Sequence, residues 1–304
     1  MSKVSCVVAT YNGEKFLKHQ LNSLLNQSRP ADEVIICDDA STDGTKRVVI
    51  DFIEKHQLKN WCFLPYSENL GFVKNFHRAL KKADGDIIFL CDQDDDWVPE
   101  KIEKMCAFFG EHKDALSLCT ALFPTDKDGE KIEVSSPIGT TNFGLVKGVM
   151  KAGEYRKISL KEALRCNPSA GCTMALRREV VEQYTENSEC IMPHDHELNL
   201  IAAKDDGLYF LNEPLTRYRL HGANTLGLSG KKQTRAEMAR EKHTFSVALK
   251  KYGTDYTEIL AQRADALENR KTLKIILLVT RVVYRKVFGL RVWLGDILYC
   301  LRGR

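Results

Sequence analysis

Short apolar runs alternate along the chain with longer stretches in which apolar residues recur every three or four positions. The runs at 4–9, 34–37, 61–64 and 87–91 are typical of strands that are buried on both faces, as parallel strands are. The stretch after each run has the spacing of a helix with one apolar face. Because strands alternate with helices, we predict an α/β fold built on a doubly wound, mostly parallel sheet.

The pattern is looser in the second half of the chain. It predicts a fifth strand just beyond residue 115, and Ser159 with Glu162 has the form of a capping box at a helix start. Glycines and lysines after residue 226 indicate a linker. We therefore expect one α/β domain over 1–226 and a basic, mostly helical appendage over 227–304.

Polar segments follow three of the predicted strands at the point where each strand ends. They are Thr-Tyr-Asn-Gly at 10–13, Asp-Asp-Ala-Ser at 38–41 and Asp-Gln-Asp-Asp at 92–95. The carboxyl ends of parallel strands share one edge of a sheet, where α/β proteins bind ligands, so we expect the three segments to face one crevice. No Gly-x-Gly-x-x-Gly follows the first strand and no Walker lysine loop occurs, which argues against a nicotinamide or flavin dinucleotide and against a P-loop.

Four carboxylates stand within five residues, at Asp92, Asp94, Asp95 and Asp96, directly after an apolar strand. Such charges repel one another, and a hard divalent cation, Mg²⁺ or Mn²⁺, explains the cluster better than a solvated acidic loop does. The spacing imitates a calcium-binding loop, but Trp97 stands where that loop needs glycine. An aspartyl phosphatase also places Asp-x-Asp after a strand. That alternative stays open, although such enzymes usually carry Thr or Val where this chain has Asp96.

The composition fits a folded protein with a full core: 304 residues, 43% apolar and 28% charged. The net charge of +4 is unevenly distributed. Residues 270–304 hold nine Lys and Arg against one Asp, a net +8, which leaves about −4 for the rest of the chain. Because the basic character is local, we expect no nucleic-acid partner, and a phosphate-rich membrane surface instead.

Drawn as a helix, residues 271–290 place Lys274, Arg281 and Arg285 on one side and an apolar face opposite. Such a helix suits the anionic cytoplasmic leaflet, and packing of its apolar face on protein is the alternative. The strand that begins at Val4 leaves no room for a signal peptide, and no apolar stretch approaches the roughly 18 residues that span a bilayer. We therefore expect a cytoplasmic protein, peripheral on the inner face of the cell membrane.

Five segments carry polar residues in a fixed order: Ala9–Gly13, Cys37–Thr45, Cys91–Trp97, His194-Asp195 and Tyr218–His221. Together they resemble glycosyltransferase family 2, whose members have the nucleotide-diphospho-sugar transferase (GT-A) fold. The form Asp-Gln-Asp-Asp, followed by Trp97, Pro99 and Lys101, resembles the rhamnosyltransferase-like branch of bacterial surface-polysaccharide enzymes. The resemblance implies that 1–226 is a GT-A catalytic domain.

The resemblance also implies a site for a nucleotide-diphospho-sugar. The first two segments would hold its base and ribose, the segment after the third strand its diphosphate, and a glycine-containing loop its sugar. The residues in these positions are Thr10, Tyr11, Asn12, Asp38, Asp39, Asn69, Gly71, Lys74, Asp92 and Gly171. Carboxylates suit the base and ribose because they accept hydrogen bonds from NH and OH groups. The simpler alternatives are a turn with a helix cap at Asp38-Asp39, a solvated helix face at Lys74 and a tight turn at Gly171.

The reacting groups are assigned by the same resemblance. Asp92 and Asp94 form the metal-binding Asp-x-Asp motif, with Asp94 as the direct ligand of Mg²⁺ or Mn²⁺ and His221 as a further ligand. Asp195 matches the catalytic base, which takes the proton of the acceptor hydroxyl as the new bond forms. With one base and no carboxylate nucleophile, we expect single displacement with inversion at the anomeric carbon.

These features predict a metal-dependent inverting glycosyltransferase that moves a sugar to a glycan or lipid-linked acceptor in cell-surface polysaccharide synthesis. The branch resemblance favours dTDP-rhamnose as the donor, with a UDP-sugar as the alternative. His196 and Glu197 replace aromatic residues often found beside the base, which bears on the choice of acceptor. The alternative function is a non-catalytic nucleotide-sugar-binding or scaffold protein of a polysaccharide assembly complex.

Overall fold

The computed structural model describes most of the chain up to residue 221: 2–134, 136, 138–142, 145–164 and 166–221. Further on it describes 262, 263, 265–267, 275 and 296. The chain divides into two compact units, Met1–Ser229 and Gly230–Arg304. In the second unit, Arg263 Nε lies 2.9 Å from Asp296 Oδ2 in a buried ion pair. The predicted linker, and the predicted basic helix apart from Ile275, lie outside the described residues.

Strand-helix units make up the first 111 residues, as the apolar pattern predicts. They are β1 (Val4–Thr10) with α1 (Leu17–Leu25), β2 (Glu33–Asp38) with α2 (Thr45–His56), β3 (Trp61–Pro65) with α3 (Phe72–Leu80), and β4 (Ile87–Asp92) with α4 (Lys101–Glu111). A short strand, β5 (Asp96–Trp97), lies between β4 and α4. The predicted strands and helices of this half are confirmed.

The second half begins with the predicted fifth strand, β6 (Ser117–Thr125). The elements that follow are β7 (Thr140–Thr141), β8 (Val146–Lys147), β9 (Tyr155–Lys157), α5 (Leu160–Ala163), a 3₁₀ turn η2 (Gly171–Thr173), β10 (Met174–Arg177), α6 (Arg178–Asn187), α7 (His194–Lys204) and β11 (Leu208–Arg219). Ser159 caps α5 in the predicted capping box with Glu162. Within the described ranges, none of the helices has the length and hydropathy needed to cross a bilayer.

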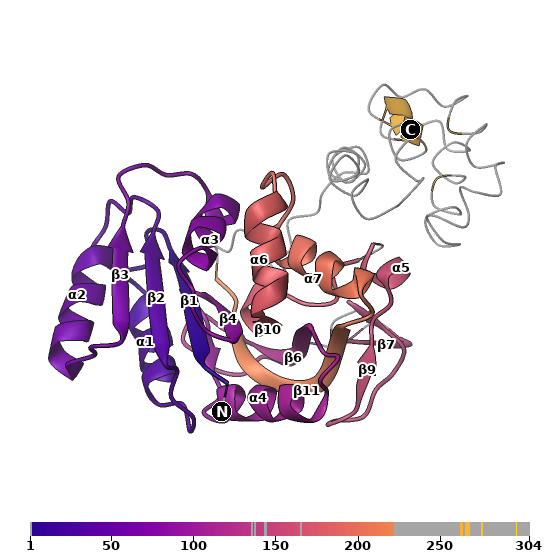
Figure 1. Cartoon of the computed structure of the whole chain (residues 1–304), viewed down its shortest axis with the longest axis horizontal. Helices are drawn as coiled ribbons and strands as arrows, with labels where there is room; N and C mark the ends of the chain where they lie inside the picture. The colour runs from indigo at the N-terminus through magenta and orange to yellow at the C-terminus, as the bar shows by residue number, and fades with distance from the viewer. Residues whose placement is uncertain are drawn as a thin grey trace. The chain divides into compact units, whose positions relative to one another are not determined.

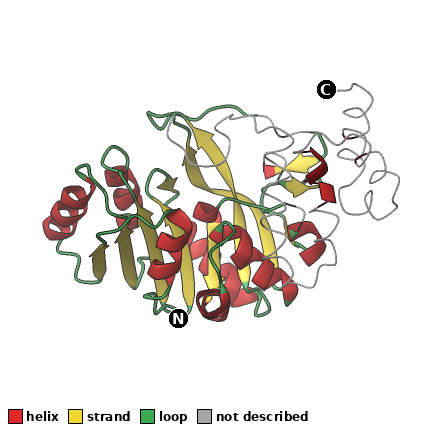
Figure 2. Ribbon diagram, turned by 90° about the horizontal axis from the view of Figure 1, so that it is seen from above, coloured by secondary structure: helices red, strands yellow, loops and turns green. Residues whose placement is uncertain are grey.

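One nine-stranded sheet runs through the described part of the first unit (Figures 1 and 2). Its strand order is β3-β2-β1-β4-β10-β6-β11-β5, with β9 paired to β11. The first four strands in that order are parallel, and β6 is parallel to β11. β10 is antiparallel to both of its neighbours. The sheet is therefore mixed and is parallel from β3 to β4, in agreement with the predicted α/β class.

The register of the sheet brings the predicted polar segments to one rim. Thr10 pairs with Asp38, and Ala9 pairs with Asp92, so the carboxyl ends of β1, β2 and β4 are level. Because β10 is antiparallel to β4, the beginning of β10 and the turn η2 before it reach the same rim. β11 ends there too, since Thr216 pairs with Trp97 of β5.

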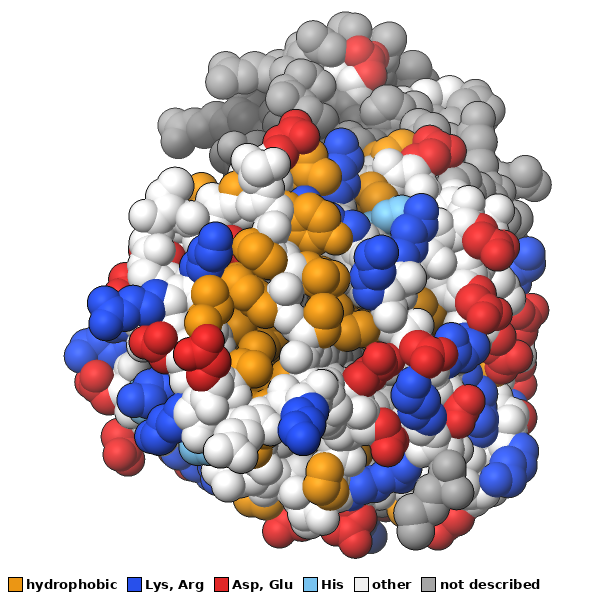
Figure 3. All heavy atoms as spheres, turned by 60° about the vertical axis from the view of Figure 1, so that its left-hand side comes forward, with side chains coloured by type: hydrophobic (Ala, Val, Ile, Leu, Met, Phe, Trp, Pro, Cys, Tyr) orange, Lys and Arg blue, Asp and Glu red, His pale blue; other side chains and the backbone are white. Residues whose placement is uncertain are grey.

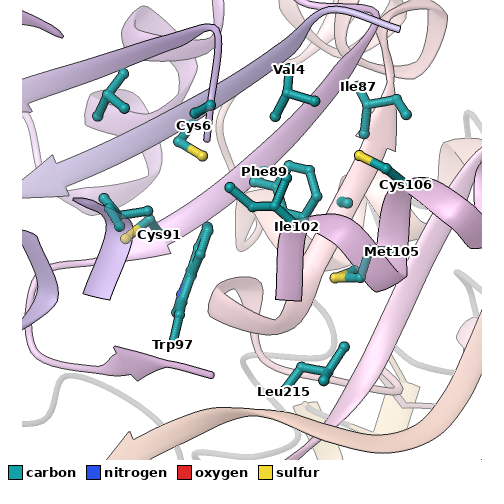
Figure 4. Close-up of a cluster of buried hydrophobic side chains, with 14 of the residues drawn as sticks. Val4, Cys6, Ile87, Phe89, Cys91, Trp97, Ile102, Met105, Cys106 and Leu215 are labelled. Atoms are coloured by element: carbon teal, nitrogen blue, oxygen red, sulfur yellow. The ribbon is translucent and has the colours of Figure 1, made fainter. Parts of the chain in front are cut away.

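The main cluster of buried apolar side chains is formed by the sheet and the helices α1, α2 and α4. Figure 4 shows part of it, with side chains of β1, β4 and α4 packed together. β1 contributes Val4, Cys6 and Val8, which share one face because side chains alternate along a strand. Trp97 is buried in this cluster, with its ring centroid 5.8 Å from that of Phe89. The core therefore reaches up to the acidic loop and fixes its position. On the opposite face lie α3, α6 and α7 (Figure 1).

Candidate active site

Hydrogen bonds around Asp38 join the loop after β1 to the loop after β2. The Asp38 carboxylate is 3% exposed and accepts hydrogen bonds from Thr10 Oγ1 and from the backbone N–H of Ser41, each at 2.9 Å. Asn12 has a φ of 49°, in the left-handed region that Asn tolerates better than most residues, and its Oδ1 accepts from the Thr42 N–H at 2.9 Å. The two loops are thus joined by the protein's own groups.

Asp39 organises the segment that leads into α3. Its carboxylate is 2.7 Å from the Arg78 guanidinium and accepts hydrogen bonds from the backbone N–H groups of Leu70 at 3.0 Å and Gly71 at 2.8 Å. The guanidinium also stacks over the Tyr66 ring, 3.5 Å from its centroid. The sequence reasoning did not name Arg78. Asp39 therefore has a structural task in addition to the base-binding role predicted for it.

The segment predicted to hold the diphosphate lies at the N-terminal end of α3. Asn69 Oδ1 accepts a hydrogen bond from the Gly71 N–H at 3.1 Å, and Gly71 has a φ of 82°, which favours glycine. Lys74 is exposed on the first turn of the helix. Backbone N–H groups and the positive end of the helix dipole make such a place suitable for an anion.

Gln93, the middle residue of Asp-Gln-Asp, spans the gap between the acidic loop and the loop after β1. Its Oε1 accepts a hydrogen bond from the Tyr11 N–H at 2.8 Å, and its Nε2 donates to the Tyr11 carbonyl oxygen at 2.9 Å. The Tyr11 side chain is left 46% exposed at the rim. Sequence reasoning quoted Gln93 only as a family marker and assigned it no contact.

The acidic loop places Asp92 beside Asp95 and Cys172. Ligand atoms of these three side chains lie within 4.8 Å of one another, the only such group of His, Cys, Asp and Glu in the described part of the chain. Removal from solvent, followed by the charges of Asp95, Asp94 and Asp195, raises the pKa of Asp92 well above its ordinary value. Burial and the charge of Asp94 raise the pKa of Asp95 to about 7. Full ionisation of the cluster is therefore unfavourable without a nearby positive charge.

Asp94 meets His221, which lies 127 residues further along the chain. His221 Nε2 is 2.9 Å from Asp94 Oδ2, and both side chains are largely buried. The His221 ring stacks on Phe16, with centroids 4.6 Å apart. Arg219 fixes the same loop from β11, because its Nε donates to the Asp94 carbonyl oxygen at 3.0 Å and its backbone N–H to Asp95 Oδ1 at 3.1 Å.

A buried lysine lies beneath the acidic cluster. Lys101 is fully buried, and its Nζ donates to Thr216 Oγ1 at 2.9 Å and to the Cys172 carbonyl oxygen. The ammonium group also lies over the Trp97 ring, 3.8 Å from its centroid. Burial lowers its pKa to about 8, and the charge of Asp95 opposes this shift. Lys101 therefore joins α4, η2 and β11 under the site.

Asp195 stands in the first turn of α7, where the helix dipole favours a carboxylate. Its Oδ1 accepts a hydrogen bond from the His196 N–H at 2.7 Å. Burial raises the pKa of Asp195 to about 6, and hydrogen bonds from His196, Asn167 and Gly171 limit the shift. The Asp195 carboxylate is close enough to Asp92 to raise the pKa of that group as well. A carboxylate with a pKa near 6 is a suitable general base at neutral pH.

His194, next to Asp195, is buried against aromatic side chains of α3. Its ring stacks on Phe76 at a centroid distance of 3.9 Å, and burial lowers its pKa to about 3, so the ring is neutral. Neither of its ring nitrogens has a hydrogen-bond partner among the described residues. A Cβ atom at position 171 would lie 3.1 Å from His194 Nε2. The lack of a side chain at Gly171 therefore makes room for His194. The sequence had predicted that Gly171 makes room for a ligand.

The two residues that follow Asp195 are held by the protein itself. His196 Nε2 lies 2.7 Å from the Ala163 carbonyl oxygen of α5, and Glu197 Oε2 accepts a hydrogen bond from Ser188 Oγ at 2.7 Å. His196 and Glu197, which stand in place of the aromatic residues often found there, thus form local hydrogen bonds that orient α7.

The predicted site residues gather in two groups along the rim. The first group lies at the ends of β1, β2 and β3, in the loops that follow them and in the first turn of α3, and comprises Thr10, Tyr11, Asn12, Asp38, Asp39, Asn69, Gly71 and Lys74. The second group lies around the end of β4, η2, the start of α7 and the end of β11, and comprises Asp92, Asp94, Gly171, Asp195 and His221. Figure 3 shows a face on which apolar side chains gather at the centre, with acidic and basic side chains interspersed around them.

Comparison with known proteins also matches the chain to glycosyltransferases. The profile of Glycosyl transferase family 2 matches residues 5–185. TarS of Staphylococcus aureus strain Mu50, a poly(ribitol-phosphate) beta-N-acetylglucosaminyltransferase, is 38% identical over 114 residues, which are 37% of this chain and 20% of TarS. An uncharacterized glycosyltransferase of Nostoc sp., alr2836, is 27% identical over 232 residues, which are 73% of this chain and 66% of that protein. The chain thus spans less than two thirds of either relative.

Two solved structures resemble the chain in fold. The crystal structure of S. aureus TarS 1–349 in complex with UDP-GlcNAc has a TM-score of 0.60 at 19% identity and covers 99% of this chain and 81% of that one. The mannosyltransferase PcManGT from Pyrobaculum calidifontis, in complex with GDP-Man and Mn²⁺, has a TM-score of 0.57 at 17% identity and covers 99% and 87%.

The fold is therefore the α/β GT-A fold that the motifs predict. The family profile matches more than half of the length of the chain, so the chain belongs to glycosyl transferase family 2.

Proposed function

We propose that this protein is a metal-dependent inverting glycosyltransferase. It moves a sugar from a nucleotide-diphospho-sugar to a hydroxyl group of a glycan acceptor during synthesis of a cell-surface polymer. Family membership supports the reaction class. TarS, which acts on poly(ribitol-phosphate) and whose structure holds UDP-GlcNAc, supports the donor class and the polymer.

One observation carries most of the proposal: groups suited to a cation and a group suited to act as base occur on one rim. Asp92 lies within electrostatic reach of both Asp94 and Asp195, and Asp94 contacts His221. Asp195 in α7 and His221 beyond β11 both follow the acidic loop at the end of β4 by about a hundred residues or more along the chain. A scaffold protein without catalysis would not need this convergence of chemically reactive groups.

The residues of the acidic loop fit a hard divalent cation. Burial and then the charges of neighbouring carboxylates raise the pKa of Asp92 and Asp95, and a bound cation would favour their ionised forms. The 2.9 Å between Asp94 Oδ2 and His221 Nε2 is also the spacing of neighbouring ligands in octahedral coordination, about 3 Å for bond lengths of about 2.1 Å. Mg²⁺ or Mn²⁺ would neutralise the charge that develops on the departing diphosphate.

Asp195 is proposed as the general base. Its raised pKa, to about 6, leaves it ionised at neutral pH yet basic enough to accept the proton of an acceptor hydroxyl. The Asp195 carboxylate accepts that proton while the hydroxyl oxygen bonds to the anomeric carbon and the diphosphate departs. Since no second carboxylate is assigned as a nucleophile, the configuration at the anomeric carbon inverts.

Two donors are supported by different observations. The Asp-Gln-Asp-Asp form with Trp97, Pro99 and Lys101 favours dTDP-rhamnose, whereas the UDP-GlcNAc bound to TarS favours a UDP-sugar. For the acceptor we propose a lipid-linked glycan, because the basic residues of 270–304 suit an anionic membrane surface. Replacement of Lys274, Arg281 and Arg285 by Gln should reduce co-sedimentation with anionic vesicles, and unchanged co-sedimentation would contradict the membrane part.

The proposal is tested by release of nucleoside diphosphate from a panel of UDP-GlcNAc, UDP-hexoses, GDP-mannose and dTDP-rhamnose. The full chain is assayed with Mn²⁺ or Mg²⁺ and, in parallel, with EDTA. We expect release from one donor class that EDTA abolishes, and a product of inverted configuration by NMR. Release that survives EDTA would contradict the metal dependence, and a product of retained configuration would contradict single displacement.

A further inference from the structure

Gln93 makes a two-point contact with the backbone of a single distant residue. Both polar atoms of its side chain are used, Oε1 by the Tyr11 N–H at 2.8 Å and Nε2 by the Tyr11 carbonyl oxygen at 2.9 Å. Tyr11 is 82 residues earlier in the chain and lies in the loop joined to the Asp38 loop. A primary amide is the group that can donate and accept in this way, much as a neighbouring strand would.

The contact between Gln93 and Tyr11 also affects the acidic loop. Gln93 stands between Asp92 and Asp94, so the contact that holds its side chain also restrains the backbone from which both carboxylates project. Its partner Tyr11 begins the loop assigned to the nucleotide. Among the described side chains, it thus connects the two groups of site residues through a hydrogen bond at each of its polar atoms.

We propose that Gln93 is a positioning residue that couples nucleotide binding at the Tyr11 loop to cation binding at the Asp92–Asp94 loop. This inference rests on the proposed function, since it presumes a nucleotide and a cation. It adds that the two bind cooperatively through the protein, in addition to any direct contact between the cation and the diphosphate. Coupling of this kind is reciprocal, because each ligand favours the loop geometry that the other needs.

Gly13 offers a second way to break the contact without altering Gln93. A Cβ atom at position 13 would lie 2.2 Å from Gln93 Oε1 and 2.6 Å from Cδ, which real atoms do not tolerate. Gly13 does not have a positive φ, so alanine is compatible with its backbone. Because the clash is with the end of a flexible side chain, Gly13→Ala should displace the Gln93 amide at little cost in stability.

The test compares the affinity for a nucleoside diphosphate in Mn²⁺ with the affinity in EDTA, measured by calorimetry on the full chain with UDP, GDP and dTDP. The ratio of the two affinities is the coupling. In Gln93→Met, which has similar length but no amide, we expect the ratio to fall about tenfold, the size expected for two neutral hydrogen bonds. Gly13→Ala should lower it similarly, and the double variant should lower it no further. Gly110→Ala is the matched control, since nothing lies within 4 Å of a Cβ atom there.

The outcomes separate this inference from the proposed function. If the wild-type chain binds none of the three nucleotides more tightly in Mn²⁺, the proposed function is wrong. If the wild-type ratio is large and Gln93→Met or Gly13→Ala leaves it unchanged, the coupling role of Gln93 is wrong. Melting temperatures near that of the wild type distinguish loss of coupling from loss of fold, and a reduced ratio that the double variant reduces further would contradict a shared contact.

Discussion

The two halves of the rim differ in how their polar groups are satisfied. In the loops after β1, β2 and β3, the carboxylates of Asp38 and Asp39 accept hydrogen bonds from backbone and side-chain donors. In the loops around β4 and α7, burial raises the pKa of Asp92, Asp95 and Asp195, and repulsion from neighbouring carboxylates adds to the shifts of Asp92 and Asp95. In the first half, the protein's own hydrogen bonds already satisfy the carboxylates. The second half carries an electrostatic cost that a cation and an acceptor would relieve.

The largest expected effect lies in the second half. Asp195→Asn should lower the rate of sugar transfer by about 10²- to 10⁴-fold, because the amide cannot take the acceptor proton. Nucleotide affinity should be unchanged, since Asp195 belongs to the other half. Asp205→Asn, at an exposed position at the end of the same helix, is the control. Steady-state kinetics with the donor found in the release assay measure both variants, and near-normal turnover of Asp195→Asn would reject the base.

A change in the first half should act on stability instead. Arg78→Met breaks a largely buried ion pair and leaves the Asp39 carboxylate without its cation, at a cost of about 3 kcal/mol in the free energy of unfolding. The comparison variant is Arg47→Met, which breaks an exposed pair with Asp51 and should cost about 0.5 kcal/mol or less. Denaturant unfolding measures the difference. Equal costs in the two variants would show that the Arg78–Asp39 pair does not stabilise the loops of the first half.

Metal affinity should separate the two halves further. Asp94→Ala should weaken Mn²⁺ binding by about 10- to 100-fold, a loss at least as large as removal of an outer-shell partner causes. In the metal-free protein, the loss of the Asp94–His221 contact and the relief of repulsion among the carboxylates act in opposite directions, so we expect little change in stability. Asp38→Ala should do the reverse, with about 1–3 kcal/mol lost from stability and Mn²⁺ affinity retained. Electron paramagnetic resonance measures the Mn²⁺ affinity, and thermal melting measures the stability. If only Asp38→Ala lost Mn²⁺ affinity, the metal site would lie in the first half, contrary to this prediction.

The pH dependence should show the smallest effect. Asp195 must be ionised to act, so kcat/KM should rise with pH up to about 6 and level off above it, at saturating Mn²⁺. The same raised pKa makes the folded protein bind more protons than the unfolded chain, so this group's contribution to stability falls as pH rises towards about 6. A profile with no inflection between pH 5 and 7 would contradict the assignment.

The strand-helix units were predictable from the sequence because buried parallel strands are nearly continuous apolar runs, as at Ile87–Asp92. The shared rim followed from the topology alone. The antiparallel course of β10 was not predictable, because a four-residue apolar strand has no directional signal in its sequence. Its direction nevertheless brings Gly171 and Cys172 to the acidic loop.

The supporting role of Lys101, which was named only as a family marker, and that of Arg78 were missed for a related reason. Lys101 bonds to Thr216, 115 residues away, and Arg78 to Asp39, 39 residues away. A lysine or arginine on a helix is usually a solvated charge, and only the packed structure reveals that Lys101 is buried and that Arg78 is largely so. Gln93 stood inside a recognised motif, yet its contact with Tyr11 depends on strand order and register.

The most direct test of the account is the position of Mn²⁺ in a crystal of the full chain grown with Mn²⁺ and the nucleoside diphosphate that it binds. Anomalous diffraction locates the ion independently of any assumption about its ligands. We predict a peak about 2.1 Å from a carboxylate oxygen of Asp94, next to His221 and on the same rim as Asp195. A peak elsewhere, or a nucleotide bound away from the loops that contain Tyr11 and Asp38, would contradict the single metal-and-base site on which the proposed function depends.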